Sequence, residues 1–208
     1  MKILIGCAGI NGESEKWDDN FNEITCVEKD PKISQVIIDR KPNRKVIIGD
    51  AYEYLLKHYQ EFDFIWFSPP CQANSRMIRS GRNRKPIFPD LKLYELKIFL
   101  DYNFKGKYVI ENVIPYYKPL IDPSIKIGRH LFWSNFDITQ FEVNQPKNFI
   151  MLGTVKGSEQ LKKWLGINYK GNIYYNGNND PCQVLRNCVH PLLGEHIFNC
   201  LIKNYETT

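Results

Sequence analysis

The feature that most constrains the fold is a regular alternation of short apolar runs with amphipathic segments along the first 110 residues. Five runs have the length and apolar composition of strands: 2–5, 23–28, 46–50, 62–67 and 107–110. Apolar residues at helical spacing lie between some of them, at 31–40 and 51–59. Strands that alternate with helices over short connections predict an α/β fold, with a mostly parallel sheet covered by helices on both faces. Ligands of such a sheet gather at the carboxyl ends of its strands.

Small and acidic residues follow the first three predicted strands. A glycine-containing loop occupies 6–12, where small side chains let a ligand approach the main chain. Glu28 ends the second strand, 19 residues after Gly9, and Asp50 ends the third. An acid at about this spacing grips a ribose diol in nucleotide-binding α/β folds, although a turn and two helix caps would explain each residue separately. Together they predict a nucleoside cofactor, either S-adenosylmethionine or a dinucleotide; the Lys-Ser/Thr pair of an ATP-binding P-loop is missing.

A candidate nucleophile and a candidate acid follow the fourth and fifth predicted strands. Two prolines and then Cys71 come after the run at 62–67, and the prolines restrict the backbone that carries the thiol. Glu111 follows the run at 107–110, so it is expected at the same edge of the sheet. A thiolate can add to an electron-poor ring carbon while a carboxylic acid hydrogen-bonds a ring nitrogen. An inert loop thiol and a structural cap are the alternatives, and the neighbouring cofactor site favours catalysis.

The excess positive charge of the chain is concentrated in one short segment. The net charge is +5, from 28 basic and 23 acidic residues. Segment 76–85 has no acidic residue and holds five basic ones: Arg76, Arg79, Arg82, Arg84 and Lys85. Most charge runs are solvated loops. This one directly follows the candidate nucleophile, so it predicts a polyanionic substrate, whose phosphates release counterions on binding.

These residues resemble those of the DNA cytosine carbon-5 methyltransferases, as a compact phage or bacterial member would. The sequence PPCQANS at 69–75 matches the family's PPCQxxS nucleophile motif, and ENV at 111–113 matches its acid motif. AGING at 8–12 is similar to the family's cofactor loop, with Asn11 in place of a glycine. RNCVHP at 186–191 is similar to the segment that precedes the family's last helix.

The resemblance implies a Rossmann-like S-adenosylmethionine-dependent methyltransferase fold, with S-adenosyl-L-methionine as cofactor and double-stranded DNA as substrate. A cytosine would be flipped out of the duplex, Cys71 would attack its carbon 6, and Glu111 would hydrogen-bond ring nitrogen 3. The family's QxRxR motif is missing in that form, and Arg129 is the best candidate substitute. The implied cofactor-binding residues are Ala8, Gly9, Ile10, Gly12, Glu28, Lys29, Asp50, Ala51, Pro69, Asn187 and Val189. The implied DNA-binding residues are Gln72, Ser75, Arg76, Arg79, Arg82, Arg84 and Lys85.

The rest of the chain predicts a small insertion followed by a return to the core. Asp90 is expected to cap a helix that reaches about Tyr102, and 129–138 to form a strand of a hairpin. Residues 1–138 then form the catalytic and cofactor-binding core, and 139–181 form an insertion that could serve as a reduced target-recognition region. The final segment, 182–208, returns to the core, with its helix beginning at about Pro191.

Two other functions stay open on the sequence. A related enzyme could use the same nucleophile and acid on RNA, such as tRNA. Alternatively, the chain could be a catalytically impaired module that binds S-adenosylmethionine or nucleic acid, which Asn11 and the missing QxRxR motif favour. Competition between RNA and DNA, and calorimetry with the cofactor, distinguish these readings.

Composition places the chain among cytoplasmic globular proteins. The 208 residues, 43% of them hydrophobic, suit one domain with a sizeable core. There is no run of 18 apolar residues and no cationic start before an apolar stretch, so neither a membrane span nor a signal peptide is expected. The six cysteines form no CxxC pair, which predicts neither a zinc site nor a dense disulfide framework. A monomer without metal is expected.

Overall fold

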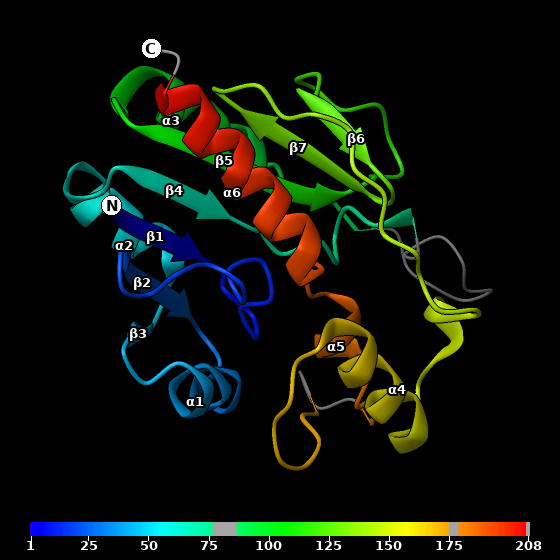
Figure 1. Cartoon of the computed structure of the whole chain (residues 1–208). Coiled ribbons are helices and arrows are strands. Elements are labelled where there is room, and N and C mark those ends of the chain that lie inside the picture. The colour runs from blue at the N-terminus through cyan, green and yellow to red at the C-terminus, as the bar shows by residue number, and fades with distance from the viewer. Residues whose placement is uncertain (77–86, 175–178, 207–208) are drawn as a thin grey trace.

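A computed structural model describes residues 1–76, 87–174 and 179–206, and its centre is one seven-stranded sheet (Figure 1). The order across the sheet is β3-β2-β1-β4-β5-β7-β6. The strands are β1 Lys2–Gly6, β2 Glu23–Glu28, β3 Lys45–Ile48, β4 Phe64–Phe67, β5 Lys107–Val113, β6 Ile125–Ile127 and β7 His130–Ser134. The first five pair in parallel, and the β6–β7 hairpin adds antiparallel to β5. The predicted α/β fold with a mostly parallel sheet is confirmed.

The strand order reverses between β1 and β4, which creates the switch point where ligands of open α/β sheets bind. From β1 the chain builds outward through β2 to β3, and it then returns to the other side of β1 for β4 and β5. The crossovers on the two sides leave the carboxyl ends of β1 and β4 without a covering helix between them. The loops that follow these two strands therefore meet at one place.

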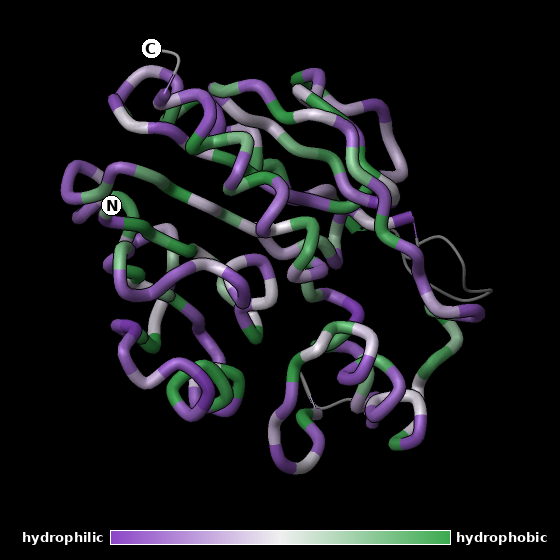
Figure 2. Tube along the Cα trace, viewed as in Figure 1, coloured by the Kyte–Doolittle hydropathy of each residue, from purple (hydrophilic) through white to green (hydrophobic). Residues whose placement is uncertain are grey.

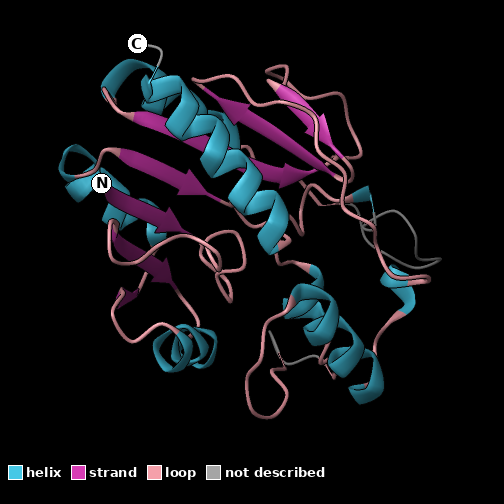
Figure 3. Cartoon of the chain, viewed as in Figure 1, coloured by secondary structure: helices cyan, strands magenta, loops and turns pink. Residues whose placement is uncertain are grey.

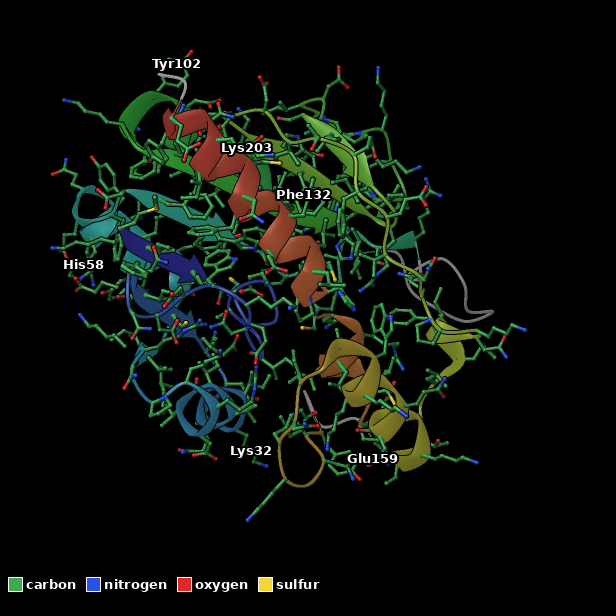
Figure 4. All side chains as sticks on the ribbon, viewed as in Figure 1. Lys32, His58, Tyr102, Phe132, Glu159 and Lys203 are labelled. Atoms are coloured by element: carbon green, nitrogen blue, oxygen red, sulfur yellow. The ribbon has the colours of Figure 1, made fainter. Side chains whose placement is uncertain are left out.

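Two layers of helices cover the sheet, because successive residues of each buried strand point to opposite faces. The helices are α1 Pro31–Arg40, α2 Ala51–His58, α3 Lys92–Asn103, α4 Val155–Leu165, α5 Gln183–Arg186 and α6 Pro191–Glu206, with 3-10 turns η1 Tyr59–Glu61 and η3 Phe149–Met151. Ile3 and Ile5 of β1 pack with residues of α1 and α6 on one face, whereas Leu4 packs with α2 and α3 on the other. Figure 3 shows α6 crossing the near face of the sheet, and Figure 4 labels Phe132 of β7 beside it. Hydrophobic residues run along β1 in Figure 2.

Local sequence explains where the first helices begin. Asp30 accepts hydrogen bonds from the amides of Lys32 and Ile33, and Pro31 occupies the first position of α1. Asp50 caps α2 in the same way. The predicted cap at Asp90 is wrong, because Leu91 is the N-cap residue of α3. The amide of Asn74 exchanges two hydrogen bonds with the main chain of Asp90, which places Asp90 in the preceding loop; its carboxylate still accepts from the amide of Lys92.

Residues 139–181 add no strand to the sheet in the part of the chain that is described, and α4 is their main element. Thr154 caps α4, and Gly166 ends it in the left-handed conformation that favours glycine. Leu161 and Leu165 of α4 belong to an apolar cluster that also contains Ile33 of α1 and Val184 of α5. This small unit is therefore packed on the core through α1, rather than being a separate globule.

The helices of the described residues are too short or too polar to span a lipid bilayer.

Candidate active site

One cavity of about 340 Å³ lies at the carboxyl ends of the central strands. Its walls come from the loop after β1, the ends of β2, β4 and β5, the start of β7, and the segment 184–189. Fourteen residues singled out from the sequence line it: Ala8, Gly9, Ile10, Glu28, Lys29, Asp50, Ala51, Pro69, Cys71, Gln72, Glu111, Arg129, Asn187 and Val189. Residues far apart in the chain are thus brought together in one space of the size that small-molecule ligands occupy.

Glu28 is held rigidly beside the glycine loop. Its Oε2 accepts a hydrogen bond from the amide of Gly9 at 2.8 Å, and its Oε1 accepts one from the amide of Asp30 at 2.9 Å. Gly9 has a φ of 54°, in the left-handed region, and a Cβ there would meet no atom within 4 Å. The loop therefore turns towards Glu28 and leaves open space above Gly9. A fixed carboxylate next to open space fits the hydroxyl groups of a ribose.

Gly12 was expected to bind the cofactor, but the structure places it in a packing contact. It is absent from the cavity lining, and a Cβ at this position would lie 2.0 Å from Sγ of Cys188 and 2.6 Å from the carbonyl oxygen of Val189. The missing side chain lets the returning segment at 188–189 press against the loop. The preceding residue, Asn11, is buried with a φ of 60°, a conformation that asparagine tolerates better than most residues.

Asp50 lines the cavity from the start of α2. Its Oδ1 accepts hydrogen bonds from the amides of Tyr52 and Glu53 at 2.9 and 3.2 Å, so the carboxylate is both a helix cap and part of the wall. Tyr52 and Lys92 line the same region, and Lys92 Nζ lies 5.1 Å from the centre of the Tyr52 ring. Neither residue carries a sequence signal, because each lies in the first turn of a helix and belongs to no motif.

The loop that carries Cys71 is anchored to β5 and to the start of α3. The Cys71 carbonyl accepts hydrogen bonds from the amides of Asn74 and Ser75, which makes a tight turn. Asn112 donates from Nδ2 to the carbonyl of Pro69 at 2.9 Å. Asn74 is tied to Asp90, as described above. Cys71 is therefore held from both sides.

The Cys71 thiol is protonated at neutral pH. Its pKa is raised to about 11, chiefly by burial and also by the nearby Glu111, whereas Arg129 and a main-chain hydrogen bond act in the opposite direction. Burial disfavours the charged thiolate, and a neighbouring negative charge acts in the same direction. Chemistry at this sulfur therefore requires the thiol proton to leave as the new bond forms.

Glu111 has a buried partner that sequence reasoning missed, His130. The Nδ1 atom of His130 lies 2.5 Å from Oε1 of Glu111, and the two residues are 6% and 5% exposed. The antiparallel register of β5 and β7 pairs Val113 with His130, which sets the ring diagonally across from Glu111. A histidine next to Arg129 was the available signal, but which of the two adjacent side chains meets Glu111 depends on the strand register.

Arg129 lines the cavity, but its guanidinium contacts α5 and η3. It donates a hydrogen bond to the carbonyl of Arg186 and lies 4.9 Å from the centre of the Phe149 ring. Burial lowers the pKa of Arg129, while Glu111 and Cys71 raise it. Arg129 therefore links β7 to α5 and η3, and the direct hydrogen-bond partner of Glu111 is His130 rather than Arg129.

The expected DNA-binding residues are only partly within the described chain. Gln72 is exposed and lines the cavity. Ser75 forms a bridge with Pro115, and Arg76 is exposed, with Nε 3.4 Å from the Pro115 carbonyl; neither of them lines the cavity. Arg79, Arg82, Arg84 and Lys85 lie outside the described residues.

Comparison with known proteins identifies the fold. No family model matches the sequence, and no curated protein matches it. A DNMT2 structure from Spodoptera frugiperda aligns over 97% of this chain and 99% of its own, with a TM-score of 0.57 and 13% identity. An Agrobacterium tumefaciens SAM-dependent methyltransferase aligns over 56% of this chain and 40% of its own length, with a TM-score of 0.41 and 15% identity.

The fold is the Rossmann-like fold of S-adenosylmethionine-dependent methyltransferases. The fold alone does not determine which group is methylated, because one such scaffold hosts many reactions.

Proposed function

We propose that this protein is a DNA cytosine carbon-5 methyltransferase that uses S-adenosyl-L-methionine. The observation that carries the proposal is that one and the same cavity is lined both by the loop and acids of a nucleoside site and by Cys71 and Glu111. The resemblance of 69–75 and 111–113 to the nucleophile and acid motifs of that enzyme family supports the same reaction. Double-stranded DNA is the proposed substrate.

The residues present fit the proposed cofactor. Glu28, fixed by two main-chain amides, would hold the ribose, and the open space above Gly9 would admit the nucleoside. Asp50 would accept a hydrogen bond from the base while its other oxygen caps α2. When bound, S-adenosyl-L-methionine supplies the methyl group that the cytosine receives.

Cys71 and Glu111 would act on opposite parts of the pyrimidine ring. The sulfur of Cys71 would form a bond to carbon 6 while a solvent water molecule takes the thiol proton, and Glu111 would hydrogen-bond ring nitrogen 3, where negative charge develops. Once carbon 5 carries the methyl group, a solvent water molecule would take the carbon-5 proton, and the electron pair left behind would restore the ring double bond and expel the sulfur of Cys71 from carbon 6. The anchoring of Cys71 by Asn74 and Asn112 holds the sulfur in place, so little reorganisation is needed during the attack.

The substrate proposal rests on charge next to the site. Segment 76–85 follows the Cys71 loop directly and carries the whole excess of positive charge in the sequence. Arg76, its first residue, is exposed on the surface. Basic side chains there would contact the phosphates while the flipped cytosine enters the cavity.

Covalent capture tests the proposal. The protein is incubated with S-adenosylmethionine and a duplex in which 5-fluorocytosine replaces cytosine, because fluorine at carbon 5 prevents the final proton removal. We expect a complex that survives denaturing electrophoresis with the wild type and is lost in Cys71→Ala. Cys200→Ala is the matched control, since Cys200 lies in the core on α6.

Methylation of natural DNA provides the second measurement. Nucleoside analysis of varied duplexes should detect 5-methylcytosine. Its absence from every duplex, together with no captured complex, would refute the proposal. Capture of a 5-fluorocytosine RNA in preference to the DNA would instead support the RNA-directed reaction.

A further inference from the structure

Glu111 forms a buried contact with His130, a residue to which none of the sequence motifs assigns a role. Among the described residues, His130 Nδ1 is the only atom that hydrogen-bonds the Glu111 carboxyl group, at Oε1. The second oxygen, Oε2, has no such partner in this part of the chain. Both residues line the cavity that contains Cys71, and β5 and β7, which carry them, lie side by side in Figure 1.

A carboxyl group needs such an anchor if one of its oxygens is to face a ligand reproducibly. The last torsion of a glutamate side chain has a broad energy minimum, so an unanchored carboxyl group turns easily. With Oε1 held by His130, rotation is blocked and Oε2 is the oxygen left for a substrate. Arg129 makes no hydrogen bond to Glu111 among the described residues: one of its terminal nitrogens bonds the Arg186 carbonyl, the guanidinium lies over the Phe149 ring, and the buried Nε has no partner.

We propose that His130 is the positioning residue of Glu111, an inference that rests on the proposed cytosine reaction. Nδ1–H of His130 donates to Oε1, so that Oε2 meets nitrogen 3 of the flipped ring. When the sulfur of Cys71 bonds carbon 6, the proton on Oε2 moves to nitrogen 3, and the remaining carboxylate keeps the hydrogen bond from Nδ1–H. When the sulfur–carbon bond breaks, nitrogen 3 returns that proton, so the pair is unchanged after each turnover.

Three other titratable groups among the described residues interact electrostatically with Glu111. They are the Cys71 thiol, the Arg129 guanidinium and the Glu13 carboxyl group. All three are in the lining of the same cavity as the pair. Once Glu111 has given its proton to nitrogen 3, the hydrogen bond from Nδ1–H to its carboxylate is charge-assisted, and it counts for more than in water because both side chains are almost entirely buried.

Two amide substitutions separate positioning from simple packing. Asparagine has its amide nitrogen near the place of histidine Nδ1, whereas glutamine has it near the place of Nε2. We expect His130→Asn to keep kcat within about threefold of the wild type, and His130→Gln to lower kcat about 10- to 100-fold. KM for DNA should change little in either variant, since the contact acts on the bound ring. His196→Gln on α6, outside the cavity lining, is the control.

Folding and cofactor binding are measured for every variant by thermal melting and by calorimetry with S-adenosylmethionine. If a variant does not fold, a measurement on the wild type still tests the role of His130. In NMR spectra of protein with ¹⁵N-labelled histidine, the Nδ1 signal of His130 should shift when 5-fluorocytosine DNA is captured. Equal kcat values for the Asn and Gln variants, or an unshifted Nδ1 signal, would overturn the role of His130. Methylation of cytosine by the wild type would still uphold the proposed function in that case. If the wild type neither methylates nor captures cytosine, both proposals fail.

Discussion

Glu13 offers a sharp test of the electrostatics of this site. It directly follows the glycine loop, is 4% exposed and lines the cavity. Its pKa is raised from 4.5 to about 8, chiefly by burial and in smaller part by Glu111, while a main-chain hydrogen bond, Arg44 and Arg40 act in the opposite direction. The folded protein therefore binds a proton at Glu13 that the unfolded chain has already released.

The pH dependence of stability follows from this difference. An acid whose pKa is higher in the folded state favours folding most at low pH, and this advantage is lost as the pH rises from about 4.5 to about 8. Each pH unit in that interval corresponds to about 1.4 kcal/mol for a full proton difference. Between pH 5 and pH 7, the free energy of unfolding should therefore fall by on the order of 3 kcal/mol because of this one group.

The substitution Glu13→Gln removes the titration and nearly preserves the shape of the side chain. Urea unfolding of wild type and variant at several pH values between 5 and 8 gives the difference in unfolding free energy. We expect the variant to gain stability relative to the wild type as the pH rises. Glu23→Gln, at an exposed residue, is the control and should follow the wild type. Parallel curves for the wild type and Glu13→Gln would refute the raised pKa.

Three further predictions follow from packing and charge. Gly194→Ala would place a Cβ 1.8 Å from the carbonyl oxygen of Glu13, so it should lower the free energy of unfolding in urea by about 1–3 kcal/mol. Gly153→Ala is the control, because its Cβ would meet no atom closer than 3.8 Å and should be tolerated. Equal losses of stability in the two variants would contradict this prediction. Arg44→Met should destabilise by about 3 kcal/mol, because the buried guanidinium bonds two residues of the loop after β1, and an unchanged melting curve would show that these bonds are dispensable. At pH 8 Cys71 should react with iodoacetamide roughly 100-fold more slowly than a free thiol, because its raised pKa leaves less of the reactive thiolate. Peptide mass spectrometry follows the reaction, and a rate equal to that of free cysteine would contradict the raised pKa.

Much of the fold and part of the site could be predicted from local sequence. Short continuous apolar runs separated by helical segments predict a parallel sheet, because a strand that is apolar on both sides must be covered by helices on both faces of the sheet. Once the sheet is parallel, the residues that follow its strands share one edge. Glu28, Asp50, Cys71 and Glu111 were expected together for that reason, and they line one cavity.

Long-range packing decided the remaining features. The absence of a side chain at Gly12 serves contact with Cys188, some 180 residues along the chain, rather than the cavity. The predicted cap at Asp90 failed because the amide of Asn74 engages its main chain. No local sequence pattern predicts the contact of Gly12 with Cys188 or that of Asn74 with Asp90.

The sequence by itself determined the sheet, the edge at which the loops after its strands meet, and the presence of Cys71 and Glu111 at that edge, because these follow from the alternation of apolar runs and helical segments and from the order of residues after each strand. Only the tertiary structure decided that His130, rather than the adjacent Arg129, meets Glu111. Successive residues of a strand point to opposite faces, so the choice between these two neighbours depends on the pairing of β7 with β5. That pairing is a property of two strands together, and neither strand encodes it alone.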